Sequence, residues 1–272
     1  MGVVNVTPDS FSDGGQFVTP EAAIAHGVRL ADAGAAVVDI GGESTRPGAA
    51  PVDESVERER VVPVIAGLAA AIDVPISVDT TKAAVAAAAI EAGAGIVNDV
   101  SAGQADPDML GVVADAGVGF VAMHMRGEPR TMQRDPQYGD VVTEVIADLA
   151  LRLDAARAAG IADDALMADP GIGFGKTIDH NLALLAHLPE LIAGLGVPVL
   201  VGTSRKTFLG RLIDEDEPAA RDDATLATVV WALERGVTMV RVHDVVGAVQ
   251  VAAILGALAR ATVARREVVE SR

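Results

Sequence analysis

The chain has 272 residues and a formal net charge of −17; half of its residues are hydrophobic and only 3% are aromatic. This acidic balance argues against a nucleic-acid or anionic-membrane partner, because either would need a basic face. The chain has no cysteine. This excludes a disulfide framework and a thiolate metal site and fits a cytoplasmic location.

Short apolar runs alternate with helical patterns along the chain, as consecutive βα units of a parallel sheet do. Eight such units are enough to close a barrel, and this length is ordinary for a barrel that forms one domain. We therefore predict an α/β protein, a single (β/α)8 TIM barrel. Its expected strands are 2–6, 36–41, 75–79, 95–99, 118–124, 165–169, 197–202 and 238–243.

The barrel is expected to span residues 1–260, followed by a charged, frayed tail over 261–272. The apolar stretch from Val245 to Ala259 is interrupted by Gln250 and falls short of the ~20 residues that span a bilayer. We therefore expect an amphipathic helix that packs on the barrel, and no membrane partner.

Two segments, 7–18 and 42–52, are too long for simple connectors and are rich in Gly, Ser and Thr. They follow the first and second predicted strands. Long βα loops on a barrel usually contribute to its active site, so we expect both to be functional.

Each predicted strand is apolar until it ends in a polar residue, and in a barrel these ends meet on one face. One such residue could equally cap a helix or form a turn, and we favour that structural role for Asp39 and Asp99. Capping does not explain the cations near the last two strands, whose loops form the phosphate site in many barrels. The set comprises Asn5, Asp39, Asp79, Asn98, His124, Asp169, Ser204, Lys206, Arg241 and His243.

The segment 171–177 follows a strand and contains Gly-Lys-Thr, as a P-loop would. However, the first glycine of that motif would fall on Pro170. This departure argues against a P-loop.

Six stretches together resemble the dihydropteroate synthases of the pterin-binding enzyme family, in that family's order and at the ends of the corresponding strands. The resemblance runs from residue 1 to about residue 258. The stretches are Asn5–Gly15, Asp39–Gly48, Val97–Ser101, Asp169–Gly171, Ser204–Lys206 and Arg241–Asp244.

The resemblance implies that the enzyme condenses 6-hydroxymethyl-7,8-dihydropterin pyrophosphate with p-aminobenzoate, giving 7,8-dihydropteroate and pyrophosphate in folate synthesis. It also implies a homodimer, inhibition by sulfonamides, and Mg²⁺ bound by the amide oxygen of Asn5. Glu128 stands where the resemblance leads us to expect Thr.

Carried over from the family, the catalytic residues are Asp79, Lys206, Arg241 and His243. The pterin would bind Asp79, Asn98, Asp169, Phe174, Lys206 and Arg241. The pyrophosphate and p-aminobenzoate would bind Phe11, Thr45, Arg46, Pro47, Ser204 and His243.

Two alternatives share the barrel. A methyltetrahydrofolate-type methyltransferase would use the same pterin pocket without a pyrophosphate site, and the basic stretches around Lys206 and Arg241 argue against it. A non-catalytic pterin-binding paralogue would have no need of the two long loops.

Overall fold

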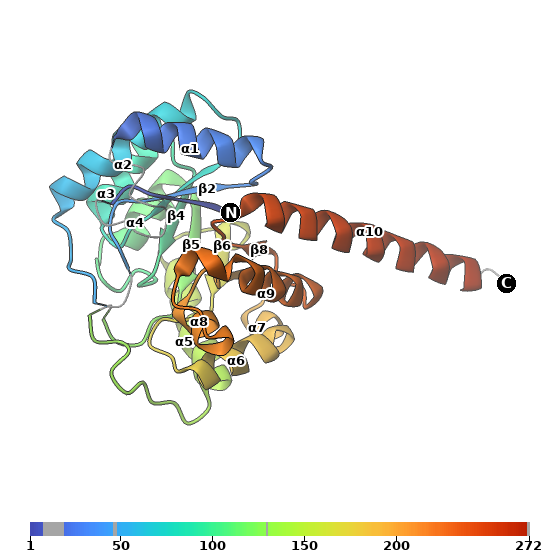
Figure 1. The fold of residues 1–272 in the computed structure, drawn as a ribbon. Helices are drawn as coiled ribbons and strands as arrows, with labels where there is room; N and C mark the ends of the chain where they lie inside the picture. The colour runs from blue at the N-terminus through green and yellow to red at the C-terminus, as the bar shows by residue number, and fades with distance from the viewer. Residues whose placement is uncertain (8–18, 46–47, 129, 271–272) are drawn as a thin grey trace.

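In the computed structural model, residues 1–7, 19–45, 48–128 and 130–270 are described, with side chains as far as residue 262. All eight predicted strands are present, and helices alternate with them along the chain (Figure 1). The strands are β1 (Gly2–Asn5), β2 (Val38–Gly41), β3 (Ile76–Asp79), β4 (Ile96–Asp99), β5 (Gly119–Met123), β6 (Leu166–Asp169), β7 (Leu200–Val201) and β8 (Met239–Val240).

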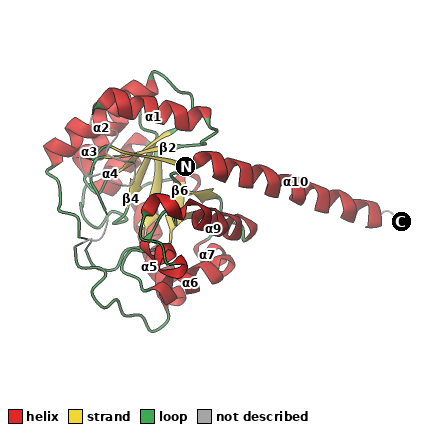
Figure 2. Ribbon diagram, in the orientation of Figure 1, coloured by secondary structure: helices red, strands yellow, loops and turns green. Residues whose placement is uncertain are grey.

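The helices surround the strands on the outside (Figure 2). They are α1 (Pro20–Asp32), α2 (Glu54–Ala69), α3 (Ala83–Glu91), α4 (Met109–Ala116), α5 (Val141–Ala158), α6 (Ile178–Ala186), α7 (Leu188–Leu195), α8 (Thr207–Ile213), α9 (Asp222–Glu234) and α10 (Val245–Glu270), with short 3₁₀ turns at Asp163–Ala165 and Pro218–Arg221.

The strands close into a barrel. Strands β1 to β6 pair in sequence order in one parallel sheet, and β7 pairs with β8. Parallel bridges between Ala168 and Val199 and between Gly2 and Val242 join the two sheets. The predicted (β/α)8 barrel is therefore confirmed.

The core consists of aliphatic side chains, as the composition indicates. Helix α5 illustrates the pattern, because Val145, Leu149 and Leu153 repeat at i,i+4 spacing and are all fully buried. The packed wall of strands and helices fixes the directions in which the strand ends point.

Helix α10 leaves the barrel and projects away from it, with the C-terminus at its far end (Figure 1). Val245 and Ala248 are buried at its start, whereas the side chains of Ile254 and Leu258 are 63% and 59% exposed. The window Val245–Thr262 is long and apolar enough to cross a membrane by length and composition alone, and 11% of it is buried. The prediction of an amphipathic helix packed on the barrel is therefore wrong beyond the first turns of α10. Small and apolar residues occupy every side of the helix, so it has no single apolar face to pack.

Residues 261–270, expected to be a frayed tail, continue helix α10 to Glu270. The helix passes through residue 260 without a break. The domain boundary at that position stays a prediction.

Candidate active site

The register of the sheet places the first polar strand ends in one row. Asn5 pairs with Gly41, Gly41 with Asp79, and Asp79 with Asn98. A Cβ atom on Gly41 would lie 3.8 Å from Asn5 Oδ1 and 3.8 Å from Asp79 Oδ2. The oxygens of Asn5 and Asp79 therefore face the same space, which Gly41 leaves open.

A cavity of about 950 Å³ opens at these strand ends. Ten of the thirteen predicted site residues line it, and the other three, Phe11, Arg46 and Pro47, lie outside the described residues. The structure thus brings together side chains from across the whole chain, while their individual roles stay predictions. The ten are Asn5, Thr45, Asp79, Asn98, Asp169, Phe174, Ser204, Lys206, Arg241 and His243.

Arg241 forms two ion pairs at the floor of this cavity. Its Nε lies 2.7 Å from Asp39 Oδ2, and its Nη2 lies 2.9 Å from Asp79 Oδ2. Asn98 Nδ2 also donates to Asp39 Oδ2, at 3.3 Å. Asp39 is fully buried and holds two predicted pterin-binding residues in place. Its role is structural, as expected, but it supports side chains of the cavity and does not form a cap or turn.

Asp99, by contrast, has the structural role expected from the sequence. Its carboxylate accepts hydrogen bonds from Ser101 N at 2.7 Å and Gly103 N at 2.6 Å. These contacts fix the turn after β4.

The environment of Asp79 changes the ionisation of its carboxyl group. Burial raises its pKa to about 7, although the Arg241 charge acts in the opposite direction. Its Oδ1 atom is buried and has no hydrogen-bond partner among the described residues. A buried acceptor of this kind is normally satisfied, so Asp79 is positioned to receive an N–H donor from a ligand.

Asp169 and Lys206 also line the cavity. Asp169 Oδ1 accepts a hydrogen bond from Gly171 N at 2.7 Å, and burial raises the pKa of Asp169. Lys206 donates to the carbonyl of Ile172, with Nζ 4.7 Å from the Phe174 ring centroid. Burial lowers the pKa of Lys206 to about 8, against the effect of the Asp169 charge.

Ser204 and His243 connect the ends of β7 and β8. Ser204 Oγ lies 2.8 Å from His243 Nδ1, and the backbone N–H of His243 donates to the same oxygen at 3.1 Å. Arg205, next to Ser204, binds Asp222 through Nε and Nη2, both at 2.8 Å. The Ser204–His243 contact therefore fixes two predicted pyrophosphate-binding groups relative to each other.

Lys176 also lines the cavity, which sequence analysis did not predict. It is almost fully buried, with Nζ 2.8 Å from His124 Nδ1 and 3.0 Å from the Phe174 carbonyl. Burial lowers the pKa of Lys176 well below its usual value and lowers that of His124 to about 3. The pair joins the loops after β5 and β6. The Gly-Lys-Thr stretch was the one sequence signal that could have drawn attention to Lys176, but we interpreted it only as a possible P-loop and set it aside.

The oxygen atoms near Asn5 are compatible with Mg²⁺. Among the described residues, no group of three or more His, Cys, Asp and Glu side chains could hold a metal ion. Mg²⁺ commonly uses only one or two protein oxygens and takes its other ligands from water and substrate phosphates. A single amide oxygen at Asn5, in the same cavity as the residues predicted to bind pyrophosphate, fits that pattern.

Fold and site together define a (β/α)8 barrel with a ligand cavity where carboxylates face cations at the strand ends. The family model for pterin binding enzymes matches residues 1–243. The dihydropteroate synthase of Mycobacterium leprae is 50% identical over 94% of this chain and 92% of its own length. The chain therefore belongs to the pterin-binding enzyme family and, within it, to the dihydropteroate synthases.

Solved structures agree with this assignment. The Yersinia pestis dihydropteroate synthase, solved with a sulfonamide drug complex, has a TM-score of 0.92 and 45% identity and covers 96% of this chain and 94% of its own. The Xanthomonas albilineans enzyme, solved with 4-aminobenzoic acid, has a TM-score of 0.88 and 50% identity, covering 95% and 92%.

Replacing Asp39 with asparagine tests its support of Arg241. Asp39→Asn removes one of the two carboxylates that pair with Arg241 and leaves Asp79 as its remaining counter-charge. The variant is therefore expected to lower the free energy of unfolding, by up to about 3 kcal/mol. Urea denaturation measures the change. The matched control is Asp163→Asn, which breaks an ion pair whose acid is 75% exposed and should cause no measurable loss. Equal effects of the two variants would contradict the supporting role of Asp39.

Proposed function

We propose that this protein is a dihydropteroate synthase. In the reaction, the amine nitrogen of p-aminobenzoate forms a bond to the exocyclic methylene of the dihydropterin pyrophosphate. The bond from that carbon to the pyrophosphate oxygen breaks, and the amine loses one proton. The products are 7,8-dihydropteroate and pyrophosphate, so the protein is a transferase of folate synthesis.

The observation that carries the proposal is one cavity with Asp79, Asn98 and Asp169 on the inner strand ends and Lys206 and Arg241 beside them. A pterin ring presents an amino group and a ring N–H on one edge, and a buried carboxylate can accept both. Asp169 supplies such a carboxylate. Lys206 donates to the acceptor atoms of the ring, and Phe174 and Arg241 contact its face.

Catalysis in this proposal needs no protein nucleophile. Departure of pyrophosphate leaves positive charge spread over the pterin, and the carboxylate of Asp79 stabilises that charge. Ser204 and His243 bind the leaving pyrophosphate, with Arg241 close by. Asn5 would hold Mg²⁺, which when bound would neutralise charge on the pyrophosphate.

The arylamine is proposed to bind between Ser204 and the segment 42–52. Thr45 lines the cavity on that side, and Phe11, Arg46 and Pro47 complete this subsite by the family pattern. The Xanthomonas structure with 4-aminobenzoic acid supports this choice of second substrate.

Release of pyrophosphate from the two substrates with Mg²⁺ tests the proposal directly. Lys206→Ala should lower kcat/KM at least about 100-fold, because it removes a buried donor to the reacting heterocycle. Arg157→Ala, which alters an exposed ion pair on α5, is the control and should retain activity. Pterin binding by the wild-type protein without any pyrophosphate release would favour the non-catalytic alternative instead.

The pKa values of Asp79 and Lys206 predict a narrow pH optimum. Asp79 must be ionised to stabilise the positive charge that develops on the pterin, so kcat/KM should rise as pH passes its pKa of about 7. Lys206 must keep its proton, so kcat/KM should fall above about 8.

Lys206→Arg separates the two limbs of this profile. Arginine stays protonated throughout the range, so this variant should lose the alkaline limb and keep the acidic one. Both enzymes receive the same titrating substrate, so the difference between their profiles belongs to the protein. An unchanged alkaline limb would show that deprotonation of Lys206 does not cause the fall of kcat/KM at high pH.

We also propose a homodimer located in the cytoplasm. The apolar side chains on α10, among them Val246, Ile254 and Leu258, are exposed in a single chain. Contact with a second copy would remove this surface from water, which is favourable by about 25 cal/mol for each Å² of apolar area. The net charge of −17 makes an anionic membrane surface an unfavourable partner.

Sedimentation velocity tests the dimer. The wild-type chain, with a mass of 27.7 kDa, should sediment as a dimer, and the double variant Ile254→Asp, Leu258→Asp as a monomer. Leu151→Asp alters a leucine on α5 that is 64% exposed and should leave the dimer intact. A monomeric wild-type protein that instead sediments with phosphatidylcholine vesicles would overturn the proposal.

A further inference from the structure

We propose that Lys82 is a positioning residue for p-aminobenzoate: by bridging Glu43 and Glu57, it fixes the base of the segment 42–52 that carries Thr45. The substrate in this inference rests on the proposed function. The bridge itself rests only on the contacts of the described residues.

Lys82 joins three elements of the barrel. It lies just before α3, Glu43 follows β2, and Glu57 is in the first turn of α2. Lys82 Nζ donates to the carboxylates of both Glu43 and Glu57. The side chain of Glu57 is fully buried, whereas those of Lys82 and Glu43 are 24% and 21% exposed. One ammonium group therefore links a buried acid in α2 to an acid at the start of the loop.

The charge of Lys82 is needed to balance the two carboxylates that it contacts. Burial raises the pKa of Glu57, while its hydrogen bond to Lys82 opposes that change. Burial lowers the pKa of Lys82, but its hydrogen bonds to Glu43 and Glu57 outweigh burial, and the net shift is upward. Without Lys82, two carboxylates would face each other, one of them buried and without its counter-charge.

Two further hydrogen bonds fix the two ends of the loop 42–52. Glu43 Oε1 accepts from the backbone N–H of Val52 at 3.4 Å, and Arg60 Nη1 donates to the carbonyl of Gly42 at 2.8 Å. Gly42 packs so closely on α2 that an added Cβ would lie 2.7 Å from Val61 Cγ1. Glu43 thus closes the loop at its base, and Lys82 ties this closure to the barrel.

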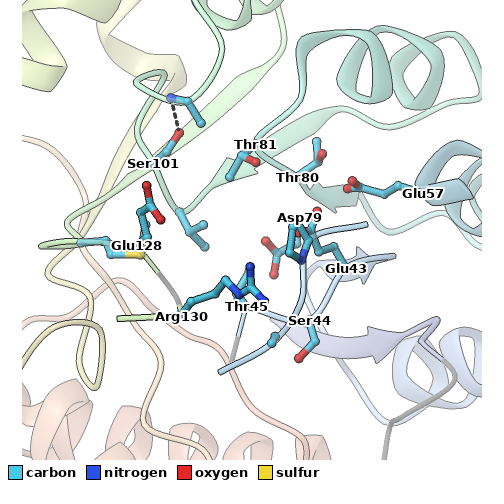
Figure 3. Close-up of a pocket in the computed structure, with 15 residues that line it drawn as sticks. Glu43, Ser44, Thr45, Glu57, Asp79, Thr80, Thr81, Ser101, Glu128 and Arg130 are labelled. Atoms are coloured by element: carbon cyan, nitrogen blue, oxygen red, sulfur yellow. Dashed lines mark hydrogen bonds between the residues drawn. The ribbon is translucent and has the colours of Figure 1, made fainter. Parts of the chain in front are cut away.

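Thr45 lies only two residues beyond Glu43, so the bridge limits where its hydroxyl can go. Figure 3 shows Glu43, Ser44 and Thr45 along one side of a smaller cavity of about 250 Å³, with Asp79 close by and the carboxylate of Glu57 pointing from its helix towards Thr80. Thr45 and Asp79 line both this cavity and the larger one. Displacement of Glu43 would therefore move one wall of the arylamine subsite and leave the pterin wall on β4 and β6 in place.

Lys82→Met tests the inference by removing the charge and keeping most of the side-chain volume. The expected result is a rise of about tenfold in the KM for p-aminobenzoate, with less than about a twofold change in the KM for the pterin pyrophosphate. Lys82→Arg retains the positive charge and should restore most of the affinity. Arg157→Met, in an exposed ion pair, is the control.

A purely structural role for Lys82 makes a different prediction. The double variant Glu57→Gln, Lys82→Met has no unpaired buried charge, so its melting temperature should recover towards that of the wild type. Positioning by Lys82 predicts that the KM for p-aminobenzoate stays high in this variant because Glu43 is still untied. A KM that recovers together with the melting temperature would overturn the inference.

Hydrogen exchange provides a measurement that does not depend on activity. The backbone amides of residues 43–52 should exchange faster in Lys82→Met and in the double variant than in the wild type, with unchanged exchange in β4 and β6. Unchanged exchange over 43–52 would reject the bridge even if the wild-type enzyme is active. A wild-type protein that releases no pyrophosphate would reject the proposed function, while faster exchange in the variants would still support the bridge.

Discussion

The site depends on the buried ion pairs of Arg241 with Asp39 and Asp79. They connect the residue after β8 to Asp39 within β2 and to Asp79 at the end of β3. A guanidinium group suits this position because its fixed fork of donors can satisfy two carboxylates at once. Through Asn98, the same network reaches β4. Three of the predicted pterin-binding side chains, Asp79, Asn98 and Arg241, are therefore held in one network with Asp39 before any ligand arrives.

This network also explains how an acidic chain can bind an anionic substrate. The net charge of −17 opposes anion binding at a distance, but salt screens exposed charges beyond roughly 8–10 Å. Inside the cavity the balance is local, with Lys206, Arg241 and the Ser204–His243 pair at the last two strands. Asp39 and Asp79 partly neutralise Arg241, so the cavity is not strongly positive without its substrate.

Sequence patterns predicted the barrel because strand ends and helices repeat with regular apolar runs. They also selected residues that meet in one cavity, since a parallel barrel brings all its strand ends to one face. Three features were beyond the sequence. Asp39 could equally have formed a turn. The exposure of α10 depends on what covers it. Lys82 contacts Glu57 and Glu43, which are 25 and 39 positions away in the sequence and form no motif with it. Each depends on contacts between distant segments, which local periodicity does not encode.

The two halves of the cavity are supported in physically different ways. On the side proposed to bind the pterin, Asp79 and Asn98 are at strand ends that are fixed by backbone pairing and, for Asp79, by a buried ion pair. The arylamine side is a loop held at its base by Lys82, Glu43 and Arg60, whose side chains remain partly accessible to water. Local stability follows buried contacts, so the pterin half should be the more rigid of the two. A changed loop can then alter the second substrate's affinity while the first substrate's subsite stays intact, and this separation is what makes the role of Lys82 measurable.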